Sequence, residues 1–295
     1  MSQALRCSLA FALLVIGCAT PIETGAFIRN RVEPLPPMPE SAQRSNISFR
    51  TADNTILRGW FMRKPRSTRT VLLFHGNGEG ILSSMWSIQW LADAFDADVL
   101  AFDARGFGFS DGTPSIDGSI ADSLSLYDEL RELDPKHRPI VVMGQSMGTA
   151  SAIHVAANRQ ADLLILLSPF SSLNDVLDAY RDKLPWYVHL RVDKSLSEVR
   201  SSPTRDLLRV TAPTLIVRGK NDPLITEAAV GRVNRACNAK VKEVCIVKGV
   251  HEDVHPTNSQ VRACIQRFAA RALPAAASTT AMTPSAPPVP LTGDP

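Results

Sequence analysis

A serine lies at the centre of the pentapeptide GQSMG, residues 144–148. An apolar run, residues 139–143, precedes the pentapeptide, and a stretch with helical spacing, residues 149–158, follows it. Small residues two positions either side of a serine allow a sharp turn between a strand and a helix, and the hydroxyl then projects beside the positive helix N-terminus. A pattern this short also occurs by chance, but its setting favours Ser146 as a nucleophile.

A serine nucleophile needs a histidine to take its proton and an acid to orient that histidine. Asp222 directly follows the apolar run 214–218 in the sequence GKNDP, and His251 follows the run 244–247 in the sequence GVHED. If both runs are parallel strands, both residues lie beyond carboxyl ends, where ligands bind to open α/β sheets.

Each of these residues has an alternative interpretation. Asp222 could simply form a turn, and His251 could be a surface histidine. His255 is a rival base, but it precedes a proline and we expect it to open the final helix. Asp193 and Asp206 are alternative acids.

Attack on a carbonyl group places negative charge on its oxygen, which fixed N–H groups stabilise. We assign one donor to the backbone N–H of Met147, next to the serine, and the other to that of Asn77. Asn77 lies in the loop HGNG, residues 75–78, after an apolar run. The glycines of this loop could instead bind a dinucleotide, but that fingerprint requires glycine or alanine where the chain has Ile81.

Strands and helices alternate along the chain and must position these residues. Two segments have the pattern of an initial hairpin, six short apolar runs have that of buried parallel strands, and helical spacing separates the runs. The sequence therefore predicts a doubly wound sheet with right-handed crossovers. The expected hairpin is 46–50 and 56–62, the further strands are 70–75, 99–103, 140–143, 163–167, 214–218 and 244–247, and the helices are 81–95, 120–133, 149–158, 226–236 and 257–271.

The segment 171–210 does not fit this alternation and is expected to form a small helical cap over the carboxyl ends of the strands. Its apolar side chains suit an acyl chain, although they could equally hold the cap on the domain. They are Leu184, Trp186, Tyr187, Val188 and Leu190.

The N-terminus predicts export and lipid attachment. Arg6 precedes an apolar stretch, 9–16, that is too short to span a bilayer and ends in VIGC, which resembles the bacterial lipoprotein cleavage signal. Cleavage would make Cys18 the N-terminus, and its thiol would carry a diacylglycerol anchor. A plain secretory signal is the alternative. Ala19 is not the aspartate associated with inner-membrane retention, which favours the outer membrane, with the domain facing the periplasm.

The chain of 295 residues divides into four parts on this interpretation. A signal peptide, 1–17, and a Pro-rich spacer after the anchor, 18–44, precede one α/β domain, 45–271, and a tail rich in Ala, Pro and Thr, 272–295, is expected to be disordered. With 32 Lys+Arg against 29 Asp+Glu, the charge gives no support for nucleic acid binding. The expected partners are a small-molecule ester or acyl substrate and a membrane surface.

Three cysteines lie in the expected domain, so an oxidising compartment would allow at most one disulfide between them. Cys245 lies in an apolar strand and is expected to be a buried thiol, which leaves Cys237 and Cys264 as a possible pair. No spacing of cysteine and histidine resembles a zinc site, and we expect no metal.

These motifs together resemble the α/β-hydrolase superfamily over about residues 45–271. The matching segments are FHGNG at 74–78, DARGFGFS at 103–110, the serine pentapeptide, SPFSS at 168–172, Asp222 and His251. The Asn77 loop and the small cap further resemble the branch of membrane-associated acyl hydrolases that includes protein depalmitoylases, which remove palmitate. Gln145 departs from that branch, which more often has arginine or histidine before the serine, and Val250 replaces the usual small residue before the histidine.

The resemblance implies the α/β-hydrolase fold, with a mainly parallel eight-stranded sheet, helices on both faces and a small cap. It also implies a serine hydrolase without a cofactor that cleaves carboxylic ester or thioester bonds through an acyl-enzyme on Ser146. A serine exopeptidase stays open as an alternative, although the small cap argues against long peptides. A non-catalytic envelope lipoprotein that uses the fold for binding is a further alternative, which the intact triad positions disfavour.

Overall fold

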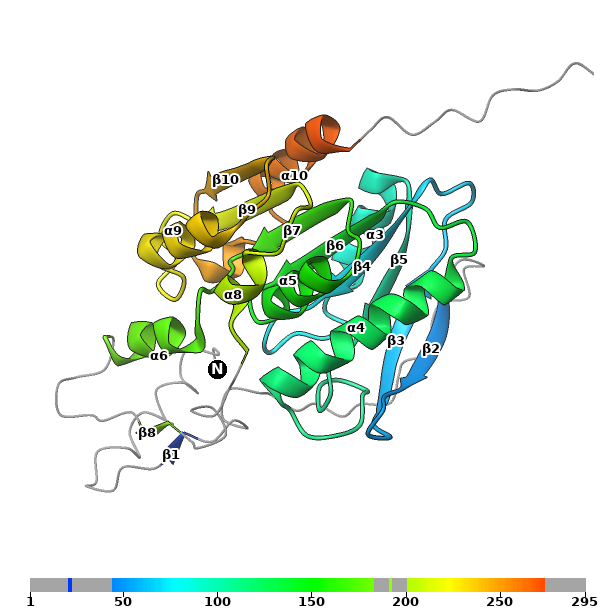
Figure 1. Cartoon of the computed structure of the whole chain (residues 1–295), viewed down its shortest axis with the longest axis horizontal. Coiled ribbons are helices and arrows are strands. Elements are labelled where there is room, and N and C mark those ends of the chain that lie inside the picture. Colours follow the sequence, from blue (N-terminus) through cyan, green and yellow to red (C-terminus); the bar gives the residue numbers. More distant parts are fainter. Residues whose placement is uncertain (1–20, 23–43, 183–190, 193–200, 274–295) are drawn as a thin grey trace, which may run out of the picture.

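An eight-stranded sheet forms the centre of the molecule in the computed structural model, which describes residues 21–22, 44–182, 191–192 and 201–273 (Figure 1). The strand order is β10-β9-β7-β6-β4-β5-β3-β2. Both pairs that involve β3 are antiparallel, and the other five pairs are parallel. The strands are β2 (Arg44–Arg50), β3 (Ile56–Met62), β4 (Arg69–Phe74), β5 (Ala97–Phe102), β6 (Ile140–Gln145), β7 (Leu163–Leu167), β9 (Thr214–Gly219) and β10 (Lys242–Val247).

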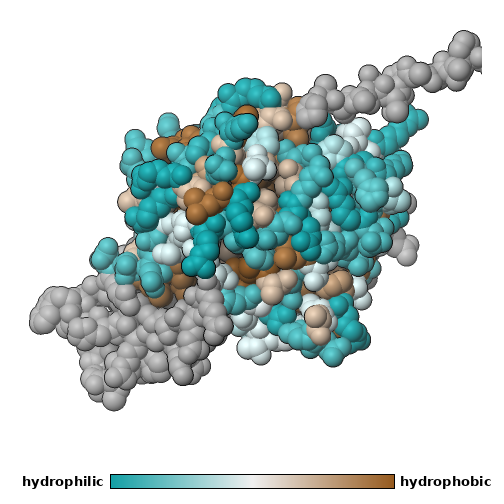
Figure 2. Space-filling view, in the orientation of Figure 1, coloured by the Kyte–Doolittle hydropathy of each residue, from teal (hydrophilic) through white to brown (hydrophobic). Residues whose placement is uncertain are grey.

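Helices cover both faces of this sheet, as the alternation in the sequence predicts. On one face lie α4 (Ile116–Leu133), α5 (Gly148–Asn158), α8 (Pro203–Leu207) and α9 (Glu227–Ala236), whereas α3 (Met85–Phe95) and α10 (Ser259–Ala272) pack on the other. In the space-filling view, much of the outer surface of the helices is hydrophilic (Figure 2). The predicted α/β-hydrolase architecture is confirmed.

Two hydrophobic cores result, one on each face, because successive residues of a strand point to opposite sides of the sheet. In β4, Leu72 belongs to the core beneath α4 and α5, while its neighbours Val71 and Leu73 belong to the core beneath α3 and α10. All three residues are nearly inaccessible to solvent. Burial on both faces explains why the central strands read as continuous apolar runs.

The parallel strands bring their carboxyl ends to one edge of the sheet. Gln145 of β6 pairs with Leu167 of β7, and Leu167 pairs with Val217 of β9. Val217 is in turn level with Cys245 of β10. The segments that follow these four strands therefore emerge side by side.

The final helix begins later than expected. Asn258 is its N-cap residue, with the side chain accepting a hydrogen bond from the backbone N–H of Gln260 at 2.9 Å. The expectation that His255 opens this helix is wrong, because Asn258 satisfies the first free N–H groups of a helix that begins at Ser259.

The disulfide joins Cys245 to Cys264, with 6.3 Å between their Cα atoms. The expectation of a buried Cys245 thiol and a bond between Cys237 and Cys264 is therefore wrong. Cys245 points to the face on which α10 packs, and α10 carries Cys264. Cys237 follows α9 and is buried as a free thiol in the core on the opposite face, so the sheet separates it from Cys264.

The segment expected to form a cap contains α6 (Leu173–Arg181) and α8 among its described parts. A two-stranded parallel pair joins β1 (Pro21–Ile22) of the spacer to β8 (Arg191–Val192) of this segment. The apolar side chains expected to line the cap lie outside the described residues, as do Asp193, Cys18 and the tail from residue 274. Among the helices that the structure describes, none has the length and apolar character needed to cross a membrane.

Removal of the disulfide should lower the free energy of unfolding by about 3 kcal/mol, because the bond closes a loop with a sequence separation of 19. We expect this loss in urea denaturation of a Cys245→Ala, Cys264→Ala double variant. The matched control is Cys237→Ala, which keeps the disulfide and should lose less. Alkylation of Cys245 and Cys264 in the unreduced, denatured protein would contradict the pairing.

Candidate active site

Ser146 lies at a tight turn between β6 and α5, as the pentapeptide predicts. Its φ of 47° is in the left-handed region that most residues avoid. A Cβ atom on Gly144 would lie 2.5 Å from the carbonyl oxygen of Gly148, and one on Gly148 would lie 2.4 Å from that of Phe74. Larger residues at these two positions would therefore collide with the backbone of the turn or of β4.

A chain of hydrogen bonds joins Ser146 to His251 and Asp222. Nε2 of His251 is 2.9 Å from the Ser146 Oγ atom, and Nδ1 of His251 is 2.8 Å from the Asp222 Oδ2 atom. Since a carboxylate only accepts, Nδ1 carries the proton and Nε2 is left to accept from the serine hydroxyl. The structure thus brings together the three residues that the sequence places 105 and 29 positions apart.

The carboxylate of Asp222 is buried and well supplied with donors. Its Oδ1 atom accepts backbone N–H bonds from Leu224 at 2.9 Å and Ile225 at 2.8 Å. Burial by itself raises the pKa of the Asp222 carboxyl, but hydrogen bonds from His251, Ile225 and Leu224 outweigh it and hold that pKa below its ordinary value. Asp222 is therefore ionised at neutral pH and holds the imidazole in one tautomer.

Ser168 is a site residue for which the sequence analysis made no assignment. Its hydroxyl donates to the Asp222 Oδ2 atom at 3.1 Å, and its φ of 49° is also left-handed. Ser168 directly follows β7, which lies between β6 and β9 in the sheet. Ser168 could therefore have been found by the same signal as Asp222 and His251, namely a polar residue directly after a predicted strand.

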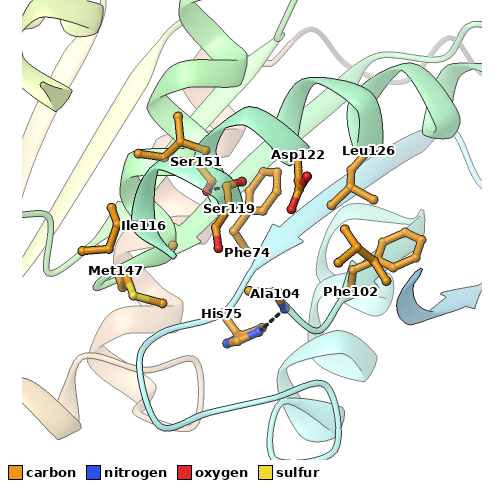
Figure 3. Close-up of a pocket in the computed structure, with 13 residues that line it drawn as sticks. Phe74, His75, Phe102, Ala104, Ile116, Ser119, Asp122, Leu126, Met147 and Ser151 are labelled. Carbon is orange, nitrogen blue, oxygen red and sulfur yellow. Dashed lines mark hydrogen bonds between the residues drawn. The ribbon is translucent and has the colours of Figure 1, made fainter. Parts of the chain in front are cut away.

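The loop that carries Asn77 is fixed by the imidazole of His75 (Figure 3). Nε2 of His75 accepts from the backbone N–H of Ala104 at 3.0 Å, so Nδ1 carries the proton and donates to the Gly76 carbonyl oxygen at 2.8 Å. In a trans peptide the C=O and the following N–H point in opposite directions, so the Asn77 N–H points away from His75. Within the described residues, the N–H groups of Asn77 and Met147 have no protein acceptor.

Asp103 connects this loop to the segment after β5. Its carboxyl oxygens accept from the backbone N–H groups of Ile81 at 2.7 Å and Phe109 at 3.0 Å. Burial raises the pKa of Asp103 above its ordinary value, against the opposing effects of His75, Phe109 and Ile81. Because Asp103 is fully buried and lies behind His75, it supports the loop and does not reach a substrate.

The rival residues have other partners. Nε2 of His255 is 3.0 Å from the Ser87 Oγ atom. Burial lowers the pKa of His255 below its ordinary value, and the nearby Glu79 carboxylate opposes this shift. The alternative acid Asp206 contacts Nδ1 of His154 at 2.7 Å, so it does not orient His251.

A small cavity of about 30 Å³ lies beside Met147, between β3, β4, β5, the N-terminal half of α4 and the first turn of α5 (Figure 3). Its lining is mainly apolar, with Phe74, Ile116 and Leu126 among the residues that line it. Among the described residues, no group of three or more His, Cys, Asp or Glu side chains could hold a metal ion.

Comparison with known proteins gives several matches. Residues 65–199 match the family model of the Hydrolase_4 family, described as serine aminopeptidase, S33. An uncharacterized protein of Mycobacterium tuberculosis is 30% identical over 230 residues, which cover 76% of this chain and 78% of that protein. The lysophosphatidylserine lipase ABHD12 of Danio rerio is 26% identical over 181 residues, which cover 56% of this chain and 47% of the lipase.

Solved structures share the fold. An esterase from Pyrococcus furiosus superposes with a TM-score of 0.68 at 21% sequence identity, over 83% of this chain and 98% of the esterase. Alpha/beta hydrolase domain-containing protein 10 from mouse gives a TM-score of 0.59 at 18% identity, over 78% of this chain and all of that one, 100%. The chain belongs to the α/β-hydrolase superfamily, and it is a hydrolase of that type.

Proposed function

We propose that this hydrolase is a serine hydrolase that cleaves carboxylic ester or thioester bonds through an acyl-enzyme on Ser146. The observation that carries the proposal is the unbroken hydrogen-bond chain from the Ser146 hydroxyl through His251 to Asp222, at 2.9 and 2.8 Å. A serine hydroxyl is a weak nucleophile unless a neighbouring base removes its proton as it attacks. His251 lies at the distance that this proton transfer requires.

The first half of the reaction forms the acyl-enzyme. The Ser146 Oγ atom attacks the substrate carbonyl carbon while its proton moves to Nε2 of His251, and the Asp222 carboxylate stabilises the imidazolium that forms. The carbonyl oxygen becomes an oxyanion, to which the N–H groups of Met147 and Asn77 donate. His251 then gives the proton to the leaving alcohol or thiol as the carbon–oxygen or carbon–sulfur bond breaks.

The second half releases the acid. Water replaces the leaving group, His251 removes one of its protons, and the resulting hydroxide equivalent attacks the acyl carbon. The same oxyanion donors act again. Collapse of this second intermediate returns the proton from His251 to the Ser146 Oγ atom, so the enzyme is regenerated without a cofactor.

A serine exopeptidase is the second candidate, because the matched family model is described as a serine aminopeptidase. An esterase and a lipase among the similar proteins support the ester substrate. The two candidates use the same three residues and differ only in the leaving group. Parallel assays with p-nitrophenyl esters of increasing chain length and with aminoacyl p-nitroanilides separate them.

We further propose that Cys18 carries a lipid anchor and places the enzyme in the bacterial cell envelope. The apolar stretch 9–16 and the sequence VIGC support this proposal. The substrate would then be an acyl compound at or near the membrane surface. An ester or thioester with a lipid acyl group, such as palmitate, has that chemistry.

Ser146→Ala should abolish labelling by a fluorophosphonate probe and lower kcat for p-nitrophenyl esters by about 10⁴-fold or more, because no other hydroxyl contacts Nε2 of His251 among the described residues. In-gel fluorescence and steady-state assays on purified protein measure both effects. The matched control is Ser48→Ala on the edge strand β2, which should label like the wild type. Equal labelling of both variants would exclude Ser146 as the nucleophile.

Asp222→Asn should lower kcat by about 10⁴-fold, because an amide in place of the carboxylate stabilises the wrong imidazole tautomer. KM should change little, since Asp222 is buried beneath His251 and away from a substrate. Steady-state kinetics on one p-nitrophenyl ester measure the change. Asp206→Asn is the matched control and should retain most of the activity; the reverse ranking of these two variants would assign the acid to Asp206.

Cys18→Ser should move the protein from the membrane fraction to the soluble periplasmic fraction or leave it with its signal uncleaved, because the hydroxyl does not take the diacylglycerol group. Fractionation of bacterial cells followed by intact-mass analysis distinguishes the forms. A control change, Cys7→Ser, lies within the expected signal and should have no effect. Normal lipid mass and membrane retention in the Cys18→Ser protein would contradict the anchor.

A further inference from the structure

Glu79 connects the loop that carries Asn77 to the turn that carries Ser146. Its Oε2 atom accepts a hydrogen bond from the backbone N–H of Gly76 at 3.1 Å, and its Oε1 atom accepts one from Nε2 of Gln145 at 2.8 Å. Gln145 is 66 residues away in the sequence and directly precedes the serine. One carboxylate therefore spans the two segments from which the oxyanion donors come.

The backbone of Gly76 fills the space between this carboxylate and the serine. A Cβ atom on Gly76 would lie 3.3 Å from the Glu79 Oε2 atom and 3.5 Å from the Ser146 Cβ atom. Glu79 takes the N–H of Gly76, and His75 takes its carbonyl oxygen. Because both polar groups of Gly76 are held, the orientation of the next N–H group, that of Asn77, is fixed as well.

The charge of Glu79 does not itself favour the reaction. A carboxylate close to a developing oxyanion raises its energy through like-charge repulsion. What the carboxylate supplies is two acceptor atoms in one plane, one for each segment.

We propose that Glu79 is a positioning residue for the oxyanion hole. It holds the loop 75–80 at a fixed distance from Ser146 by accepting from Gly76 and Gln145, and it does not touch the substrate. The proposal rests on the proposed function, since it assigns Asn77 and Met147 as the donors. Misplacement of one oxyanion donor costs about 10²- to 10³-fold in kcat.

Glu79→Ala should therefore lower kcat by about 10²-fold with a change in KM of less than about threefold, because donors to the transition state are misplaced while ground-state binding is kept. Glu79→Gln should stay within about threefold of the wild type. The glutamine oxygen can accept from Gly76, and its NH₂ group can donate to Gln145 once that amide turns over. Glu132→Ala, an exposed carboxylate of α4, is the matched control and should be unchanged.

A transition-state analogue distinguishes positioning from general destabilisation. A trifluoromethyl ketone forms a tetrahedral oxyanion adduct with the serine, so its Ki for Glu79→Ala should rise by the factor by which kcat/KM falls. Melting temperatures measured alongside identify any loss from unfolding. A Glu79→Ala protein with wild-type kcat and Ki, or a Glu79→Gln protein as impaired as Glu79→Ala, would overturn the proposal.

Gln145→Leu provides a second variant in case Glu79→Ala does not fold. It breaks one of the two contacts and should lower kcat less than Glu79→Ala does, and the double variant should be no worse than Glu79→Ala alone, since both changes remove one shared link. Additive losses, or wild-type activity for Gln145→Leu, would overturn the link between the two segments. Failure of the wild type itself to hydrolyse any ester or bind the ketone would instead overturn the proposed function.

Discussion

The left-handed backbone of Ser146 is the constraint on which the arrangement of the site depends. Such a conformation costs a residue with a side chain about 1–2 kcal/mol. Here the backbone N–H of Ser146 donates to the carbonyl oxygen of Leu167 at 2.8 Å, which extends the pairing of β6 with β7 by one residue into the turn. This hydrogen bond to the sheet offsets the cost of the left-handed conformation. It also holds the Ser146 hydroxyl close to the loops that follow the neighbouring strands.

Ser168, after the neighbouring strand, has the same left-handed backbone and the same kind of hydrogen bond to the sheet. Ser168 follows β7, and its backbone N–H donates to the carbonyl oxygen of Val217 in β9 at 2.8 Å. Its side chain is then free to contact Asp222, which follows β9. Two neighbouring strands therefore end in left-handed turns, and the backbone of each turn is hydrogen-bonded to the next strand. Asp222 and Ser146 are thus held relative to each other by backbone hydrogen bonds as well as by the contacts of His251.

The carboxylates near this edge have separate tasks. Asp222 receives donors from His251 and from two backbone N–H groups, which keeps it charged. Asp103 receives only two backbone donors, and burial dominates its ionisation. Glu79 joins two loops. The same functional group acts by charge in the first case and by its geometry in the third.

Much of this organisation could be predicted from the sequence. Every expected strand is present. The central strands gave the clearest signal, because residues buried on both faces of a sheet form apolar runs, and these runs end where the site begins. The starts of the helices were predicted less accurately than the strands. Helix α4 begins at Ile116, one turn before the first expected residue. It begins there because the Ser115 side chain caps it by accepting a hydrogen bond from the backbone N–H of Gly118. Capping depends on local backbone geometry, which apolar spacing does not report.

Contacts that depend on register could not be predicted. The cysteine pairing depends on the face of the sheet that each side chain occupies. A shift of one residue in β10 would have turned the Cys245 side chain toward the face on which Cys237 lies. The roles of Ser168 and Glu79 likewise require knowledge of which strands are neighbours and how the loops beyond them approach each other. Spacing along the chain was enough to predict that Ser146, Asp222 and His251 meet, whereas the residues that support them could be found only from the fold.

The Cys245–Cys264 bond encloses more than a strand and a helix. The chain between the two cysteines contains His251 and His255, so the proposed base lies on a covalently closed ring that is attached to the fold at β10 and α10. If α10 were to detach locally from the sheet, the ring would still restrict how far the imidazole could travel from the serine. His251, the proposed general base, is therefore restrained on both sides by this ring, whereas Ser146 lies outside it and is positioned by hydrogen bonds and packing.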